Sequence, residues 1–139
     1  MAESLPSGAE WARNWLRTSP FGQHLGMRLE RLERDLAVMV LPFQPALATL
    51  GSLVHGGAIG ALIDTAATAA AWSGAEVGPQ PRGATASMTV NYLAGGQGED
   101  LTATARVTKR GRSLSFCTVD VTGAKGGLVA QGIVTYKLG

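Results

Sequence analysis

The sequence predicts a single α+β domain in which a mainly antiparallel sheet wraps around one long helix. Three observations support this prediction. Residues 56–73 form the only long run with helical character, and it is apolar nearly all round, which is typical of a helix buried on most sides. Four consecutive segments after it alternate polar and apolar residues, as strands do. Short turns separate these segments, so neighbouring strands are expected to run antiparallel.

The N-terminal third is expected to hold a short helix and then a β-hairpin. Residues 8–17, GAEWARNWLR, have the spacing of an amphipathic helix, which a Pro- and Gly-containing segment then interrupts. In residues 27–42 apolar side chains recur at every second position, and Asp35 suits the turn between two strands. The charged centre of that segment is also compatible with a helix. These patterns divide the chain into an N-terminal helical extension, residues 1–19, and one domain, residues 20–139.

Four strands are expected after the long helix. They correspond to residues 84–93, 101–108, 113–122 and 128–138. The last two are joined by GAKGG, which is typical of a hairpin turn. Simple alternation along the first strand places Thr85 and Ser87 together on a polar face, opposite Met88 and Tyr92.

Composition and charge exclude several classes of function. Hydrophobic residues make up 45% of the chain, as in globular proteins, and the formal net charge of +2 is too small to indicate nucleic-acid binding. The one cysteine, Cys117, permits no intrachain disulfide. A membrane span is not expected, because Asp64 interrupts the apolar run at residues 56–75. The N-terminus lacks the apolar core of a secretory signal, so we expect a cytoplasmic protein.

A metal site is not expected either. The two histidines, His24 and His55, lie far apart in the sequence, and neither is accompanied by cysteines at metal-ligand spacing. We therefore expect that no metal and no bound cofactor takes part in the function.

The most specific stretch is LVHGGAIGALIDTA, residues 53–66, at the start of the long helix. The first turn of a helix leaves backbone N–H groups without internal partners, and these groups carry partial positive charge. Gly56 and Gly57 have no Cβ, so a ligand carbonyl can approach that backbone closely and be polarised by it. Asp64 is the only ionisable residue in the apolar run that follows. The motif therefore predicts a polar site on an apolar helix.

Each part of this motif also has a purely structural explanation. Two glycines can form a tight entry into a packed helix, a histidine can cap it, and a helix carboxylate can satisfy a buried donor. Asp64 lies nine residues after His55, about 13 Å along a helix axis, so the two side chains of one chain are not expected to reach the same atom. A site that uses both is most simply built across a dimer interface.

Three segments together are similar to one known family. HGGAIGALIDTAATAAA, GATASMTVNYLAG and VTKRGRSLSF resemble the hotdog-fold acyl-CoA thioesterases, most closely those of the phenylacetate-degradation (PaaI-like) type. The similarity covers about residues 20–139 and agrees with the order of elements predicted above. It implies a hotdog fold and the hydrolysis of an acyl-CoA thioester to a carboxylic acid and CoA. Coenzyme A is then part of the substrate, and no separate cofactor is needed.

The resemblance also implies roles for individual residues. Asp64 occupies the position of the acid that acts as nucleophile or as the base that activates water. The N–H groups of Gly56 and Gly57 would hold the thioester carbonyl, with His55 beside them. A hydroxyl residue on the strand after the helix often helps to orient the water in this family, which points to Thr85.

Further residues are candidates for substrate binding. Ser87 is the second choice for the hydroxyl role. Many relatives carry Asn six residues before the histidine, where this chain has Thr49, whose shorter side chain can donate one hydrogen bond. CoA brings phosphates, and four basic residues are candidates to bind them: Lys109, Arg110 and Arg112 at one strand junction, and Arg82 beside the site strand. A solvated hairpin explains the basic residues of the junction equally well.

The expected partner is a second copy of the chain. Exposed sheet edges favour a homodimer, and a homotetramer formed as a dimer of dimers. Two other functions stay open: a hotdog dehydratase or hydratase acting on a 3-hydroxyacyl thioester, and a non-catalytic acyl-CoA-binding module. Aryl, phenylacetyl and medium-chain aliphatic acyl groups are all compatible with the sequence, as is an acyl-carrier protein in place of CoA.

Overall fold

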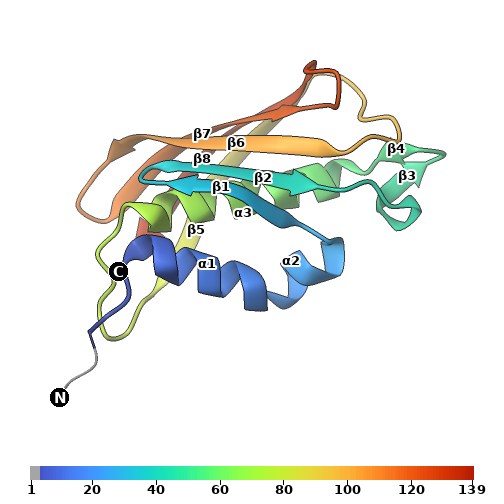
Figure 1. Ribbon diagram of the computed structural model, residues 1–139. Helices are drawn as coiled ribbons and strands as arrows, with labels where there is room; N and C mark the ends of the chain where they lie inside the picture. Colours follow the sequence, from blue (N-terminus) through green and yellow to red (C-terminus); the bar gives the residue numbers. More distant parts are fainter. Residues whose placement is uncertain (1–3) are drawn as a thin grey trace.

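The computed structural model describes residues 4–139, so residues 1–3 of the predicted N-terminal extension lie outside the described residues. A six-stranded antiparallel sheet packs against one long helix, α3 (Gly56–Ser73), which lies along one face of it (Figure 1). The predicted α+β arrangement is confirmed.

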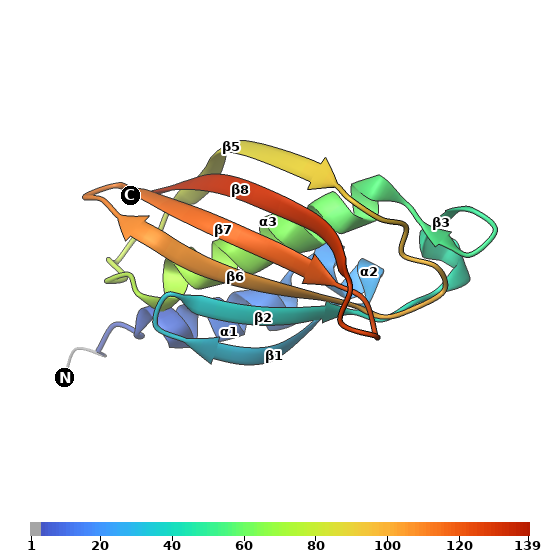
Figure 2. The same cartoon turned by 90° about the horizontal axis from the view of Figure 1, so that it is seen from above.

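The sheet has the strand order β1-β2-β6-β7-β8-β5, and every neighbouring pair is antiparallel. Its strands are β1 (Arg28–Glu33), β2 (Leu36–Leu41), β5 (Gly83–Tyr92), β6 (Leu101–Arg110), β7 (Leu114–Thr122) and β8 (Leu128–Leu138). Seen from above, the strands cover α3, with β1 and β5 at the two edges (Figure 2). All four strands predicted after the long helix are therefore present, close to their predicted bounds.

The hairpin predicted near the N-terminus is formed by β1 and β2. Asp35 occupies the turn with φ of 63°, a left-handed conformation that aspartate tolerates better than most residues. Its backbone N–H donates to Ser73 Oγ at 2.9 Å, and its carboxylate accepts from Arg110 Nη2 at 2.6 Å. The turn is thus tied both to the end of α3 and to β6.

Two helices precede the hairpin, α1 (Gly8–Thr18) and α2 (Pro20–Leu25). The predicted break after α1 is present, but the chain at once begins a second short helix, because Ser19 ends α1 and its hydroxyl caps α2. Pro20 takes the first helical position, where its missing N–H costs nothing. α1 packs against α3 (Figure 1). A small hairpin of β3 (Ala48–Leu50) and β4 (Leu53–Val54) leads into α3.

α3 is almost entirely buried, as its composition predicts. Its many alanines allow the sheet to approach closely, and at Gly132 on β8 an added Cβ would lie 2.6 Å from Ile63 Cγ2. In the middle of the helix, the half-buried residues are Ala61, Asp64 and Thr65, which form one stripe. No helix among residues 4–139 combines the length and hydropathy required to cross a bilayer.

Candidate active site

The middle of α3 carries a carboxylate that a neighbouring strand holds. Thr85 on β5 donates a hydrogen bond from Oγ1 to Asp64 Oδ1 at 2.6 Å. This is the length expected for a hydroxyl bound to a charged oxygen. No other side chain or backbone group among residues 4–139 donates to this carboxylate, so Oδ2 is left for a ligand or water.

The direction of Thr85 depends on an irregularity in β5. Along β8, Thr85 lies opposite Tyr136 and Ser87 lies opposite Thr135, so Ala86 has no partner of its own. Because the Tyr136 side chain is buried toward α3, Thr85 faces the helix and Ser87 faces the outside of the sheet. The prediction that these two residues share a face is therefore wrong: the extra residue of a bulge reverses the alternation. Only one of the two candidate hydroxyls, that of Thr85, reaches the acid.

The first turn of α3 holds a second group of polar atoms. His55 is the N-cap, and its Nδ1 accepts the N–H of Gly57 at 2.7 Å. The hydroxyl of Tyr92 donates to the carbonyl oxygen of Gly56 at 2.7 Å. Within residues 4–139, the N–H of Gly56 has no protein acceptor. Of the two glycine N–H groups predicted to bind a carbonyl, that of Gly56 is available and that of Gly57 is occupied.

Tyr92 is a residue of this group that the sequence did not indicate, since alternation assigned it only to the apolar side of a strand. Its ring covers the helix start so closely that a Cβ on Gly56 would lie 3.3 Å from two ring carbons. The only available signal was a tyrosine at the end of the strand that follows the helix. That signal does not show that the hydroxyl reaches back to the helix N-terminus.

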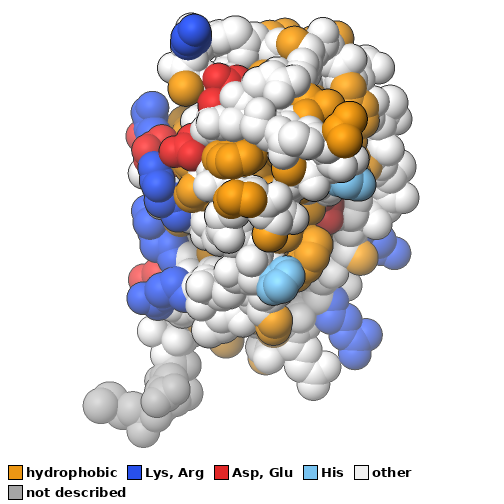
Figure 3. Space-filling view, turned by 90° about the vertical axis from the view of Figure 1, so that its right-hand side faces the viewer, with side chains coloured by type: hydrophobic (Ala, Val, Ile, Leu, Met, Phe, Trp, Pro, Cys, Tyr) orange, Lys and Arg blue, Asp and Glu red, His pale blue; other side chains and the backbone are white. Residues whose placement is uncertain are grey.

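The two polar groups lie at different places on one helix. Asp64 follows Gly56 by eight residues, which is about 12 Å along the helix axis. Figure 3 views the molecule from the end at which α3 begins, and both histidines reach the surface there among scattered hydrophobic side chains. Within one chain the Asp64 carboxylate and the first turn of α3 therefore do not meet.

Two other potential nucleophiles near α3 are held in their protonated forms. Burial raises the pKa of the Cys117 thiol to about 11, so little thiolate exists at neutral pH. Burial also raises the pKa of Tyr136, a hydrogen bond from Trp72 opposes this, and the charge of Asp64 adds to the rise. Asp64 is the better candidate for chemistry.

A cleft of about 340 Å³ opens beside Thr85. Its walls include three indole rings, of Trp11 and Trp15 on α1 and of Trp72 on α3. Trp72 is only 6% exposed and donates its Nε1–H to Tyr136 Oη at 3.0 Å. The rings of Trp11 and Trp72 have centroids 5.5 Å apart. Trp11 and Trp72 thus pack α1 onto α3, and the three indole rings line a cleft beside Thr85, the residue that holds the acid.

The basic candidates lie near the C-terminal end of α3. Arg110 is bound to Asp35 and Ser115, whereas Lys109 and Arg112 are exposed. A depression of about 390 Å³ joins Arg110 and Arg112 to residues 74–76, which follow the helix. Their assignment to CoA phosphates stays a prediction.

The remaining candidates lie at the surface. Arg82 is exposed just before β5, and Thr49 is exposed on β3, where its side chain makes no hydrogen bond among residues 4–139. Within the same residues, no three His, Cys, Asp or Glu side chains are grouped closely enough to hold a metal ion. The expectation that no metal or cofactor takes part stays a prediction.

Comparison with known proteins agrees with the fold. The family model described as thioesterase superfamily matches residues 51–130, which include α3 and strands β5–β7. The medium/long-chain acyl-CoA thioesterase YigI of Escherichia coli K12 is 28% identical over 133 residues, which cover 86% of each chain.

Solved structures share the whole fold. A thioesterase family protein from Silicibacter pomeroyi is 25% identical and superposes with a TM-score of 0.87, over 95% of this chain and 98% of that one. The PaaI protein of the phenylacetic acid degradation operon of E. coli superposes with a TM-score of 0.81 at 21% identity, over 94% of this chain and 92% of its own. The hotdog fold and the resemblance predicted from the three sequence segments are confirmed.

Proposed function

This chain belongs to the thioesterase superfamily, and from this premise we propose that it hydrolyses an acyl-CoA thioester to a carboxylic acid and CoA. The observation that carries the proposal is the hydrogen bond from Thr85 to Asp64, which holds a carboxylate on an otherwise apolar helix. A carboxylate loses hydration when it is partly buried, and this costs free energy. A chemical task for Asp64 accounts for that cost.

Asp64 can act on the thioester in two ways. As a general base it takes a proton from water, the water oxygen attacks the carbonyl carbon, the C–S bond breaks and CoA leaves as its thiolate. As a nucleophile its own oxygen attacks the carbonyl carbon, the C–S bond breaks and CoA leaves as its thiolate; water then hydrolyses the mixed anhydride to the carboxylic acid and the free Asp64 carboxylate. Both routes need one carboxylate oxygen directed at the substrate. The bond from Thr85 to Oδ1 leaves Oδ2 for this task.

The N–H of Gly56 is the proposed donor to the thioester oxygen. It belongs to the first turn of α3, where the helix dipole favours developing negative charge. The hydrogen bond from Tyr92 to the Gly56 carbonyl holds this turn in place. Gly57 was the other predicted donor, but its N–H is directed at the His55 imidazole. We therefore assign the main contact to Gly56.

The mechanism requires two copies of the chain, because Gly56 and Asp64 lie about 12 Å apart along one helix. β5 is an edge strand, and its outer side has no partner strand among residues 4–139. Pairing of β5 with β5 of a second copy would bring the two α3 helices together, so that Asp64 of one copy faces Gly56 of the other. We propose a homodimer, assembled further into a homotetramer, that works in the cytoplasm.

The cleft beside Thr85 that is lined by Trp11, Trp15 and Trp72, here called the aromatic cleft, is the proposed site of the acyl group. Its volume of about 340 Å³ suits a small apolar group. The flat faces of Trp11, Trp15 and Trp72 favour a planar aryl group over a flexible chain of the same size. An arylacetyl or aroyl thioester is therefore the first substrate to test.

Removal of one cleft wall tests this assignment. Trp15→Ala is expected to raise KM for phenylacetyl-CoA about 10-fold, because one ring contact with the acyl group is lost. KM for acetyl-CoA should change little, since its methyl group does not reach the ring. Steady-state kinetics with both substrates give the comparison. An equal change for the two substrates would contradict the assignment of the cleft to the acyl group.

Thr85 is a positioning residue, and its contribution is separable from that of Asp64. Thr85→Val keeps the shape but removes the donor to Oδ1, and kcat is expected to fall about 10- to 100-fold, the value of one hydrogen bond to a charged group. Thr85→Ser retains the hydroxyl and is expected to recover most of that loss. If Thr85→Val keeps wild-type kcat, the hydrogen bond to Asp64 does not contribute to catalysis, and the positioning role of Thr85 is wrong.

The direct test of the proposed function is release of free thiol from a panel of acyl-CoAs by the wild-type protein. Turnover of any member above the uncatalysed rate supports the proposal. Dehydration of a 3-hydroxyacyl-CoA without thiol release would favour the hydratase reading instead. Saturable CoA binding with neither reaction would favour a binding module.

A further inference from the structure

A second cavity lies between the N-terminal helices and β1, on the other side of α1 from the aromatic cleft. Its volume is about 570 Å³, within the range of roughly 300–1,000 Å³ typical of small-molecule sites. The two cavities share no lining residue. α3 contributes only Thr65, which is the neighbour of Asp64 but is rotated by about 100° around the helix. Neither proposed reaction step uses this cavity.

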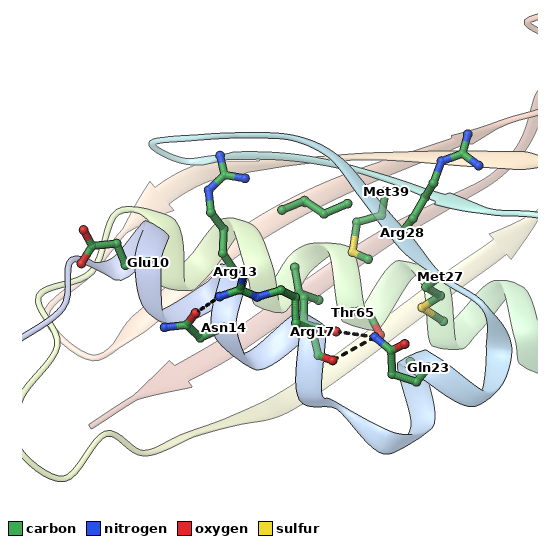
Figure 4. A pocket seen from close by; sticks show the side chains of 12 residues that line it. Glu10, Arg13, Asn14, Arg17, Gln23, Met27, Arg28, Met39 and Thr65 are labelled. Carbon is green, nitrogen blue, oxygen red and sulfur yellow. Dashed lines mark hydrogen bonds between the residues drawn. The ribbon is translucent and has the colours of Figure 1, made fainter.

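The floor of this second cavity is apolar and adaptable. Met27 and Met39 point into the space between α1 and β1 (Figure 4). They are 9% and 1% exposed, and Leu16 and Leu29 complete the apolar lining. Unbranched methionine side chains change rotamer easily and fit flexible ligands. An alkyl chain is the ligand group that such a surface accommodates.

The rim of the cavity is basic on its helix side. Arg13 and Arg17 extend from α1 beside the opening (Figure 4). Arg13 reaches only a backbone oxygen at 3.4 Å, and Arg17 binds the neutral side chain of Asn14. Among residues 4–139, neither arginine makes a salt bridge. Both guanidinium groups keep donors for an anionic ligand.

The strand side of the rim adds a third positive charge. The closest carboxylate to Arg28 is that of Glu30, at 4.0 Å, and both side chains are more than half exposed. Glu10 is the one acid in the lining, and its carboxylate already accepts the N–H of Ser7 in the helix cap. Figure 3 shows Lys and Arg side chains, with Asp and Glu among them, along the side of the molecule that carries α1 and β1; the lining of the cavity itself has three arginines and one glutamate. The opening therefore has a net positive charge.

We propose that this cavity binds a medium-chain fatty carboxylate. The alkyl chain lies on Met27 and Met39, and the carboxylate is held by Arg13 and Arg17, with Arg28 nearby. Arg guanidinium groups bind carboxylates in paired hydrogen bonds. A small inorganic anion would leave the half-buried Leu16 and Leu29 uncovered, and a neutral hydrocarbon would leave the guanidinium groups unpaired. Only a ligand with both parts satisfies both surfaces.

Two hydrogen bonds keep the site in shape without a ligand. Gln23 on α2 donates to the carbonyl oxygens of Leu16 and Arg17 at 3.2 and 3.1 Å. These bonds fix the angle between α1 and α2 above the opening (Figure 4). The bound carboxylate thus needs little rearrangement of the backbone.

The test is isothermal titration calorimetry of the full chain with decanoate, at concentrations below micelle formation. We expect saturable binding at one site per chain, and at least about 10-fold weaker binding of 1-decanol, which lacks the charge. Arg13→Gln combined with Arg17→Gln should weaken decanoate binding at least about 10-fold. Arg31→Gln removes an exposed charge from β1 outside the cavity and should leave binding unchanged.

Three results would overturn the proposal: no saturable binding of decanoate, equal binding of decanol, or equal binding by the double arginine variant. Loss of decanoate binding in Trp15→Ala with full binding in the double arginine variant would place the ligand in the aromatic cleft and also overturn it. The same titration with Asp64→Asn is expected to give the wild-type affinity. The test of decanoate binding is therefore independent of whether the protein hydrolyses thioesters.

Discussion

Asp64→Asn is expected to lower kcat for acyl-CoA hydrolysis by about 10²- to 10⁴-fold, the range for loss of a general base. Asparagine has nearly the same shape, and its amide oxygen can still accept the hydrogen bond from Thr85, so the geometry should survive. What is lost is the oxygen that takes a proton or attacks the carbonyl carbon. Thiol release under saturating substrate measures the change.

The matched control is Asp120→Asn. Asp120 is exposed on β7, and among residues 4–139 its carboxylate accepts only from Gln131, at 2.9 Å. This variant removes the same charge away from the site and should keep wild-type kcat. Thermal melts of both variants should agree with wild type within a few degrees. If Asp64→Asn retains full activity, Asp64 has no part in the chemistry, and the proposed mechanism is wrong.

Gly8→Ala is expected to destabilise the fold by about 1–3 kcal/mol, the usual cost of forcing atoms into a packed site. Gly8 is the first residue of α1 and is buried against the end of α3. An added Cβ would lie 2.0 Å from the carbonyl oxygen of Trp72 and 2.6 Å from that of Ala75. Both are backbone atoms, so α1 must move away from α3. Urea denaturation followed by circular dichroism measures the loss.

Gly78→Ala is the control for Gly8→Ala. Nothing lies within 4 Å of a Cβ at Gly78, so this substitution should change stability by less than about 0.5 kcal/mol. Equal stability of the two variants would mean that α1 does not depend on its contact with α3. Residues 1–19 would then be a separable extension, as the sequence alone suggested. A clear loss of stability in Gly8→Ala alone would mean that α1 is part of the packed domain.

Periodic features of the fold were predictable from the sequence. The run at 56–73 is apolar on all sides, which only a buried helix tolerates, and it became α3. The strands followed from alternation, and the first hairpin from Asp35 between two alternating runs. These patterns arise from neighbours along the chain. They need no knowledge of which segments meet.

The candidate site was predictable only in part. Asp64 stood out because it is a lone charge in an apolar helix, and the family resemblance pointed to Thr85 as the hydroxyl that orients the water. The structure shows a hydrogen bond from Thr85 to Asp64, and the role of Thr85 toward water stays a prediction. Alternation alone predicted the wrong face for one of the two hydroxyl residues, because it placed Thr85 and Ser87 on the same side of β5. Tyr92 was missed because its contact with Gly56 joins residues 36 apart in the chain.

The sequence by itself therefore determined the buried helix, the antiparallel strands and the isolated acid at its centre. Tertiary structure decided which groups face that acid. One unpaired residue in β5 turns Thr85 inward and Ser87 outward, because a single insertion reverses every later side chain. The His55 imidazole accepts a hydrogen bond from the N–H of Gly57, and the N–H of Gly56 stays available. This difference depends on the rotamer of the His55 side chain. The two faces of α1 become walls of two different cavities only because that helix packs against both α3 and β1.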